Sequence, residues 1–159
     1  MADDYASYLE ERYQGEVYGE AVMRALAEVA SDPLQAHKLR HLEQLERETK
    51  ELLLPEVEAT GGETRESAEK IAEAEKLGAQ FGQVPWSDRM RAMTGQLEKY
   101  VADFRRCEAL APPGKEALLK HVTAHEQALL DFANRELAGS DPEHSLAPVV
   151  ALLREVPGD

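Results

Sequence analysis

The sequence predicts an all-α fold, a four-helix bundle made of two antiparallel helical hairpins with a helical crossover and a short C-terminal helix. Apolar residues recur with the helical period along almost the whole chain, and no stretch alternates apolar and polar residues long enough to indicate a strand. Gly and Pro gather at a few joints. With 159 residues and neither an internal repeat nor a linker, the chain is expected to form one domain over residues 1–159.

The first predicted hairpin covers roughly the first third of the chain. Its first helix, over residues 4–30, has an apolar side formed by Leu9, Tyr13, Val22, Met23, Leu26 and Val29. Asp32 and Pro33 end this helix and begin the next, because Asp accepts hydrogen bonds from free N–H groups and Pro suits the first helical position. The second helix is expected to reach Leu54, where Pro55 would stop or kink it.

A crossover and a second hairpin follow. A loop over residues 56–63 precedes a more polar helix over residues 65–81. Ser87 is expected to cap the third long helix. The apolar stripe of that helix is Met90, Met93, Leu97, Tyr100, Val101 and Phe104. Pro112, Pro113 and Gly114 separate it from a helix over residues 115–137, and a short last helix runs from Asp141 through Leu153. Short joints make each pair of long helices antiparallel neighbours.

The charge of the chain restricts its function. Asp and Glu number 31 and Lys and Arg 18, which gives a net charge of −13. We expect no nucleic-acid partner and no anionic membrane surface, since both require basic residues. No apolar run approaches the ~20 residues of a membrane span, and the acidic start differs from a basic signal or transit peptide. Cys107 is the single cysteine, so no internal disulfide can form, and the sequence predicts a soluble cytoplasmic protein.

Three polar residues fall in the apolar stripes of separate helices. They are Glu16 in the first helix, Glu46 in the second and His125 in the fourth long helix. Counted from Asp32, Glu16 lies 16 residues back and Glu46 14 residues forward, so their heights differ by only ~3 Å. A buried carboxylate needs a cation, a proton or a hydrogen-bond donor. These residues predict a polar layer at the middle of the bundle, with Glu20 at a similar height on the neighbouring face.

Two segments resemble ligand-bearing helices of the ferritin-like superfamily of di-iron carboxylate proteins, which includes the rubrerythrins. Residues 15–22 (GEVYGEAV) resemble the first helix of the demethoxyubiquinone hydroxylases, where the Glu after Gly binds iron. Residues 121–129 (HVTAHEQAL) resemble the fourth-helix ligand region of ferritin-like proteins. The resemblance implies a ferritin-like bundle with iron or manganese in its core. The candidate metal ligands are Glu16, Glu46 and His125, with Glu20 and His121 as bridging or supporting groups.

The chain also departs from that superfamily. The usual site has one Glu from each of two helices and an E-x-x-H pair from each of the other two, and no E-x-x-H occurs here. Thr49 stands where the His would follow Glu46, and Val122 stands where the Glu would precede His125. The site is therefore remodelled with further ligands such as Glu43, or binds one metal ion, or has lost metal altogether.

Each polar residue also has an interpretation without metal. Glu16 and Glu20 suit a solvated flank, and Glu46 lies in a charged run that is typical of surface ion pairs. His125 suits a hydrogen-bonded core histidine. Gly15 and Gly19 suit either a close helix approach or a tolerant flank. The remaining residues that stand out are predicted as follows: His37 and His41 at the surface, Tyr100 packed in the core, Cys107 a small buried hydrophobe, and Trp86 an anchor where the third long helix begins.

Two functions therefore remain open. One is a metal-binding ferritin-like protein in redox or oxygen chemistry, whose carboxylates and imidazole suit Fe(II) or Mn(II). The other is a metal-free bundle that acts by association, as a homodimer or with another protein, and its acidic surface favours a basic partner. A hemerythrin-like bundle is a third and more distant idea, because the histidine pairs lie on the wrong helices. The chain has no phosphate-binding loop, nucleophile elbow, C-x-x-C or dinucleotide fingerprint, which excludes those enzyme classes.

Overall fold

The structure is a computed structural model that describes residues 2–157, and within this range every regular element is a helix. The prediction of an all-α fold is confirmed. The elements are α1 (Tyr5–Val29), α2 (Pro33–Ala59), α3 (Ala68–Phe81), α4 (Trp86–Cys107), the 3₁₀ helix η1 (Glu108–Leu110), α5 (Glu116–Leu137) and α6 (Pro142–Val150). None of the described helices is long and apolar enough to cross a membrane.

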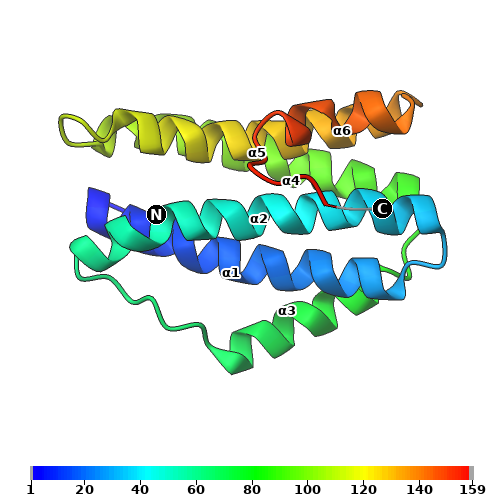
Figure 1. Ribbon diagram of the computed structural model, residues 1–159, viewed down its shortest axis with the longest axis horizontal. Coiled ribbons are helices and arrows are strands. Elements are labelled where there is room, and N and C mark those ends of the chain that lie inside the picture. Colours follow the sequence, from blue (N-terminus) through cyan, green and yellow to red (C-terminus); the bar gives the residue numbers. More distant parts are fainter. Residues whose placement is uncertain (1, 158–159) are drawn as a thin grey trace.

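The four long helices α1, α2, α4 and α5 run roughly along the long axis of the molecule (Figure 1). Helix α1 packs along α2, and α4 packs along α5. The crossover helix α3 packs against α1, and α6 packs on α5 and also reaches α2. Two short joints, at residues 30–32 and 111–115, therefore each connect a pair of neighbouring helices.

The predicted N-cap of α2 is confirmed at Asp32, whose side chain accepts a hydrogen bond from Leu34 N at 2.8 Å. The prediction that Ser87 caps α4 is wrong, because the helix begins one residue earlier and follows Pro85. Tertiary contacts of Trp86 fix this start. Its ring lies edge-on to Phe132 with centroids 6.5 Å apart, and its Nε1 donates to Glu136 at 2.9 Å. The anchoring role expected of Trp86 agrees with these contacts.

The prediction that Pro55 stops α2 is also wrong, because the helix continues to Ala59. Proline removes one backbone hydrogen bond from a helix and crowds the carbonyl four residues earlier. Here that carbonyl belongs to Glu51, and both residues are exposed, so water can reach the free carbonyl. Beyond the proline, Val57 is fully buried. Burial of Val57 stabilises the extra turn, and Gly61, two residues after the last helical residue Ala59, turns the chain away with a φ of +76°.

Three other boundaries or placements differ from the prediction. Helix α3 begins at Ala68 instead of residue 65, and α6 ends at Val150 before the predicted Leu153. Tyr100, predicted to pack in the core, is 40% exposed. It stacks on Phe104 and accepts a hydrogen bond from Gln96 at 2.7 Å, so its hydroxyl is satisfied at the surface.

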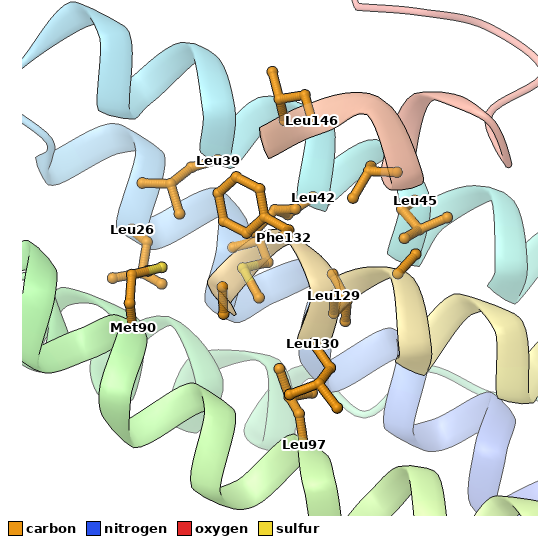
Figure 2. Close-up of a cluster of buried hydrophobic side chains, with 14 of the residues drawn as sticks. Leu26, Leu39, Leu42, Leu45, Met90, Leu97, Leu129, Leu130, Phe132 and Leu146 are labelled. Atoms are coloured by element: carbon orange, nitrogen blue, oxygen red, sulfur yellow. The ribbon is translucent and has the colours of Figure 1, made fainter. Parts of the chain in front are cut away.

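The buried apolar residues form two separate clusters. The larger one, in the half of the molecule that contains α6, includes Leu26, Leu42, Leu97, Leu129 and Phe132, which point toward one another in Figure 2. The smaller one lies in the other half and is made of Tyr8, Leu9, Tyr13, Val17, Leu53, Val57, Phe104, Cys107, Leu119 and Val122. Between the two clusters, α2 carries Glu46 and Thr49 and α5 carries His125, while Glu16 of α1 precedes Val17 at the edge of the smaller cluster. These polar residues form the candidate site.

Helix α3 lies very close to α1. A Cβ added at Gly78 would be 2.6 Å from the carbonyl oxygen of Val22 and 2.9 Å from the Cβ of Ala25. Only glycine permits this approach. The crossover is therefore a closely packed part of the structure, and its last turns lie beside the C-terminal part of α1.

Candidate metal centre

Three side chains from three helices converge between the two apolar clusters. Glu16 of α1, Glu46 of α2 and His125 of α5 each offer one ligand atom, and these atoms all lie within 4.8 Å of one another. Their exposed fractions are 5%, 6% and 1%. Among residues 2–157 this is the one group of three or more His, Cys, Asp or Glu side chains arranged in this way.

Thr49 of α2 orients the imidazole of His125. The Thr49 Oγ1 lies 2.7 Å from His125 Nδ1, and Glu46 Oε2 lies 3.5 Å from His125 Nε2. When Nδ1 carries the proton, it donates to Thr49 and leaves the Nε2 lone pair facing Glu46. A hydrogen bond of this kind on the second ring nitrogen is what supports a metal-binding histidine.

Two buried polar atoms of this group have no hydrogen-bond partner. They are Glu16 Oε2 and His125 Nε2. Such atoms are rare because a buried group without a partner loses the hydrogen bonds that it made to water. In the part of the chain that the structure describes, no Lys or Arg forms an ion pair with Glu16 or Glu46. Apart from His125, no cationic side chain therefore forms an ion pair with these two carboxyl groups, and Arg12 acts on Glu16 only from a greater distance.

The three groups change one another's protonation. Burial raises the pKa of Glu16 well above its usual range, and the neighbouring Glu46 carboxylate raises it further. Burial alone would raise the pKa of Glu46, but the charge of the nearby His125 ring outweighs it and lowers that pKa. Burial alone would lower the pKa of His125, whereas the Glu46 carboxylate raises it above the usual value. Without metal, these shifts favour the protonated form of Glu16, the ionised form of Glu46 and the protonated form of His125.

Gly19 of α1 gives the Glu46 side chain its space. A Cβ at Gly19 would lie 2.7 Å from both Cδ and Oε2 of Glu46. The carboxylate thus rests against the bare backbone of α1. Gly15, one turn earlier, has only Arg12 Nη1 at 4.0 Å from such a Cβ. The close approach that the sequence suggested for both glycines is present at Gly19 and absent at Gly15.

A cavity of about 520 Å³ adjoins Glu16 and Glu46. Glu16 and Glu46 form part of its wall, together with Glu126 of α5 and Arg12 of α1. The rest of the wall is mostly apolar and comes from α1, α3, α4 and α5. Burial raises the pKa of Glu126 to about 7, while His125 lowers it in part. A small molecule in this cavity would be adjacent to the carboxyl groups.

The other predicted ligands lie elsewhere. Glu20 is buried, but it accepts hydrogen bonds from Arg47 Nε at 2.8 Å and Lys50 Nζ at 2.6 Å. His121 is half-buried, its pKa is lowered by burial and by His125, and it is not part of the close group. Glu43 binds Arg40 and Arg47.

The surface interpretations of Glu16, Glu20, Glu46 and His41 are wrong, because all four side chains are buried. Glu46 was also compatible with the charged surface of α2, yet it is buried. His41 is 3% exposed, and its Nδ1 lies 2.9 Å from the carbonyl oxygen of His37. It therefore belongs to the buried face of α2. Cys107 is buried at 8% exposure, as expected of a small hydrophobe. The buried face of α2, which includes Leu42 and Thr49, is therefore wider than a single heptad series indicates.

Sequence reasoning missed Glu126 and the orienting role of Thr49. Glu126 follows His125 directly, and adjacent helical residues differ by about 100° in direction, so one stripe does not include both. A useful signal was available at Thr49, which the heptad series already placed in the core. A buried hydroxyl requires a hydrogen-bond partner, and the only polar residues of that layer were the three named above.

The donor set fits one metal ion and does not fit two. Thr49 and Val122 replace ligands of the usual E-x-x-H pairs, and Tyr100, at the corresponding height on α4, is 40% exposed and not a member of the close group. Comparison of the chain with protein-family models, with curated proteins and with solved structures found no match. The resemblance to the ferritin-like superfamily therefore stays a prediction.

Proposed function

We propose that this chain is a ferritin-like four-helix bundle that binds one Fe(II) or Mn(II) ion through Glu16, Glu46 and His125 and uses it in redox or oxygen chemistry. The observation that supports the proposal most directly is the pair of buried atoms without partners, Glu16 Oε2 and His125 Nε2, within one group of potential ligands. A metal ion coordinated by these atoms would replace the missing hydrogen bonds.

The chemistry of the donors favours these two metals. Two carboxylates and one imidazole form a set of mainly hard ligands that suits Fe(II) and Mn(II) better than the soft metals that prefer thiolates. Three protein ligands also leave coordination positions free for water or a small molecule. The cavity beside Glu16 and Glu46 provides the space for such a molecule.

Metal loading tests the proposal. Metal-free protein titrated anaerobically with Mn(II) or Fe(II) is expected to bind one ion per chain, measured by elemental analysis after desalting. The double variant Glu46→Ala with His125→Ala is expected to bind none. A matched control, Glu98→Ala with His144→Ala, removes one Glu and one His from exposed positions and should keep the metal. If wild-type protein retains no metal after this loading, the proposal is wrong.

The metal-free alternative remains a second candidate because protons on Glu16 and His125 can compensate the charge of the buried carboxyl groups without a metal ion. A neutral Glu16, an ionised Glu46 and a cationic His125 form a cluster without net charge. On this alternative the chain is an interaction module, either a homodimer or bound to a basic protein. Its test is the same titration, since a module of this kind stays folded and unchanged in thermal stability at any concentration of Mn(II).

If metal is bound, a second measurement separates chemistry from structure. Iron-loaded protein is supplied with a reductant, and oxygen consumption is followed with an electrode. Consumption that exceeds that of the Glu46→Ala, His125→Ala variant supports a redox role, whereas equal rates indicate that the ion only holds the helices together.

A further inference from the structure

The cavity beside the candidate metal centre has two chemically different ends. On α1 its wall runs from Arg12 and Glu16 to Met23 and Leu26, and these residues span about 21 Å at the helical rise. Met23 and Leu26 belong to the larger apolar cluster, as does Leu97 of α4, which also lines the cavity. The charged side chains therefore lie at one end, and the other end is apolar.

Arg12 is the cationic side chain of the charged end. Its guanidinium carbon lies 4.2 Å from the centroid of the Phe104 ring and 5.6 Å from that of Tyr8, and contacts with ring faces do not use its N–H groups as hydrogen-bond donors to an acceptor atom. Its Nε is buried without a hydrogen-bond partner. Within residues 2–157 no carboxylate forms an ion pair with this guanidinium. A buried donor without a partner is costly, so this end of the cavity lacks an acceptor.

The three carboxyl groups at the same end do not take that place. Glu46 Oε2 faces His125 Nε2 at 3.5 Å. Burial raises the pKa of Glu126 to about 7 and that of Glu16 well above its usual range, which reduces the negative charge of both. Arg12 acts on these two groups only from a distance. Its own charge does not depend on pH, so the guanidinium stays a cation without a contacting anion.

Tyr100 of α4 supplies a second donor. Its ring stacks on Phe104 with centroids 6.1 Å apart, so it neighbours the same aromatic ring as Arg12. The Tyr100 hydroxyl oxygen accepts a hydrogen bond from Gln96 at 2.7 Å, and its own O–H donates to no residue in the described part of the chain. Tyr100 and Gln96 both line the cavity. A guanidinium and a phenol O–H are thus available to an acceptor bound there.

We infer that the cavity binds an apolar monocarboxylate, with its carboxylate at Arg12 and Tyr100 and its hydrocarbon chain along the apolar end. A guanidinium presents a planar fork of N–H groups that matches a carboxylate. The volume of about 520 Å³ is that of a site for a small organic molecule. The apolar end disfavours a dicarboxylate, whose second charge would lose its hydration there. This inference goes beyond the proposed function and does not depend on it, because neither Arg12 nor the apolar end requires a metal ion.

Three probes with the same chain and different head groups test the inference. Metal-free full-length protein is titrated calorimetrically at pH 7 with octanoate, n-octanol and n-octylamine. Octanoate is expected to bind about tenfold or more tightly than octanol, because a charged hydrogen bond adds affinity. Octylamine is expected to bind most weakly, since its ammonium group is repelled by Arg12. Octanol or octylamine binding as tight as that of octanoate, or no octanoate binding, overturns the inference. Failure of metal loading with normal octanoate binding would reject only the proposed function.

Variants of two arginines locate the carboxylate. Arg12→Gln should weaken octanoate binding about tenfold or more and leave octanol binding nearly unchanged, so that the two probes bind alike. Arg91→Gln is the matched control, because it makes the same change of charge at an exposed position of α4 outside the cavity wall, and it should alter neither probe. A folded Arg12→Gln protein that binds octanoate like wild type contradicts the inference.

Two further variants test the same site without changing Arg12, whose side chain also packs on aromatic rings. Tyr100→Phe removes only a hydroxyl from a side chain that is 40% exposed, and it should weaken octanoate binding about threefold or more. Met93→Trp adds bulk at a half-buried position of the cavity wall and should abolish binding of octanoate and octanol. Circular dichroism of each variant reports folding. Wild-type octanoate affinity in either folded variant places the ligand elsewhere and refutes the inference.

Discussion

Two buried carboxyl groups one turn apart on α1 are stabilised in opposite ways. Glu20 is 7% exposed and is held by Arg47 and Lys50 on the outer side of the α1–α2 pair. Glu16 is 5% exposed and shares its surroundings with Glu46 and His125. Glu20 thus forms ion pairs with two basic side chains, whereas Glu16 forms none with a described Lys or Arg. The difference indicates that burial alone does not identify a binding site, whereas burial without a compensating group does.

The largest expected effect is on metal affinity, which should depend on Glu16 and not on Glu20. Glu16→Gln removes a proposed ligand and should weaken Mn(II) binding at least about 100-fold, the upper range seen when even a supporting group of a metal site is lost. Glu20→Gln should leave Mn(II) affinity unchanged, since its carboxylate binds Arg47 and Lys50. Isothermal titration calorimetry of both variants measures the ratio.

The stability of the same variants provides the control. In metal-free protein, Glu20→Gln leaves Lys50, whose side chain is 17% exposed, with a weaker partner and should cost about 1–2 kcal/mol of unfolding free energy. Burial raises the pKa of Glu16 and favours its neutral form in that state, so Glu16→Gln should change the unfolding free energy by less than about 0.5 kcal/mol. Loss of metal in Glu20→Gln, or a large stability loss in Glu16→Gln, would contradict the distinction.

The pH dependence of metal-free protein sharpens the comparison. Burial raises the pKa of Glu126 from its usual 4.5 to about 7, and the pKa values of Glu16 and His125 are raised as well. Groups with a raised pKa stabilise the fold fully below their unfolded pKa, and this contribution is lost as pH rises through the folded value. Unfolding free energy should therefore fall by about 2–3 kcal/mol between pH 4.5 and 7 from Glu126 alone.

Urea unfolding at several pH values measures this slope, and Glu126→Gln should reduce it while Glu98→Gln should not. Below pH 4.5 the trend reverses, because the lowered pKa values of Glu46 and Glu48 give stability that is lost on acidification. A stability that rises steadily from pH 5 to 8 would show that the buried carboxyl groups are ionised in the fold.

The smallest effect concerns the two glycines of α1. Gly19→Ala places a Cβ against the Glu46 carboxylate, which is the flexible end of its side chain, so the carboxylate shifts at little cost to stability. We expect Mn(II) affinity to fall about tenfold. Gly15→Ala meets no such contact, should leave affinity unchanged and should stabilise the helix by about 0.5–1 kcal/mol. Manganese electron paramagnetic resonance and thermal melts measure both; equal affinities would contradict the role given to Gly19.

The helical period predicted the elements well because most of the chain is amphipathic, and it placed Glu16, Glu46 and His125 inside. Local signals failed where a tertiary contact outweighed them. Packing of Val57 in its cluster stabilises α2 beyond Pro55, and the contacts of Trp86 stabilise a start of α4 before Ser87. Capping and proline effects amount to about 1–3 kcal/mol, which the burial of one or two large side chains can match.

The site was harder to predict because a stripe gives the direction of a residue but not its partners. Glu16 and Glu20 both suited the same layer, and only the positions of Arg47 and Lys50, on the neighbouring helix, separate them. The cavity and the contribution of Glu126 depend on how α3 and α4 sit beside α1. Such relations between distant segments are set by packing and are not contained in the periodicity of one helix.

The division of the apolar interior into two clusters has a consequence for cooperativity. Each half of the molecule has its own hydrophobic contacts, and the layer between them contributes little apolar burial. Without an ion, the smaller half, which contains Tyr13 and Val57, can open while the larger half stays intact, as an independent unit of hydrogen exchange. An ion that joins α1, α2 and α5 at the boundary would couple the halves, so that the whole molecule melts as one.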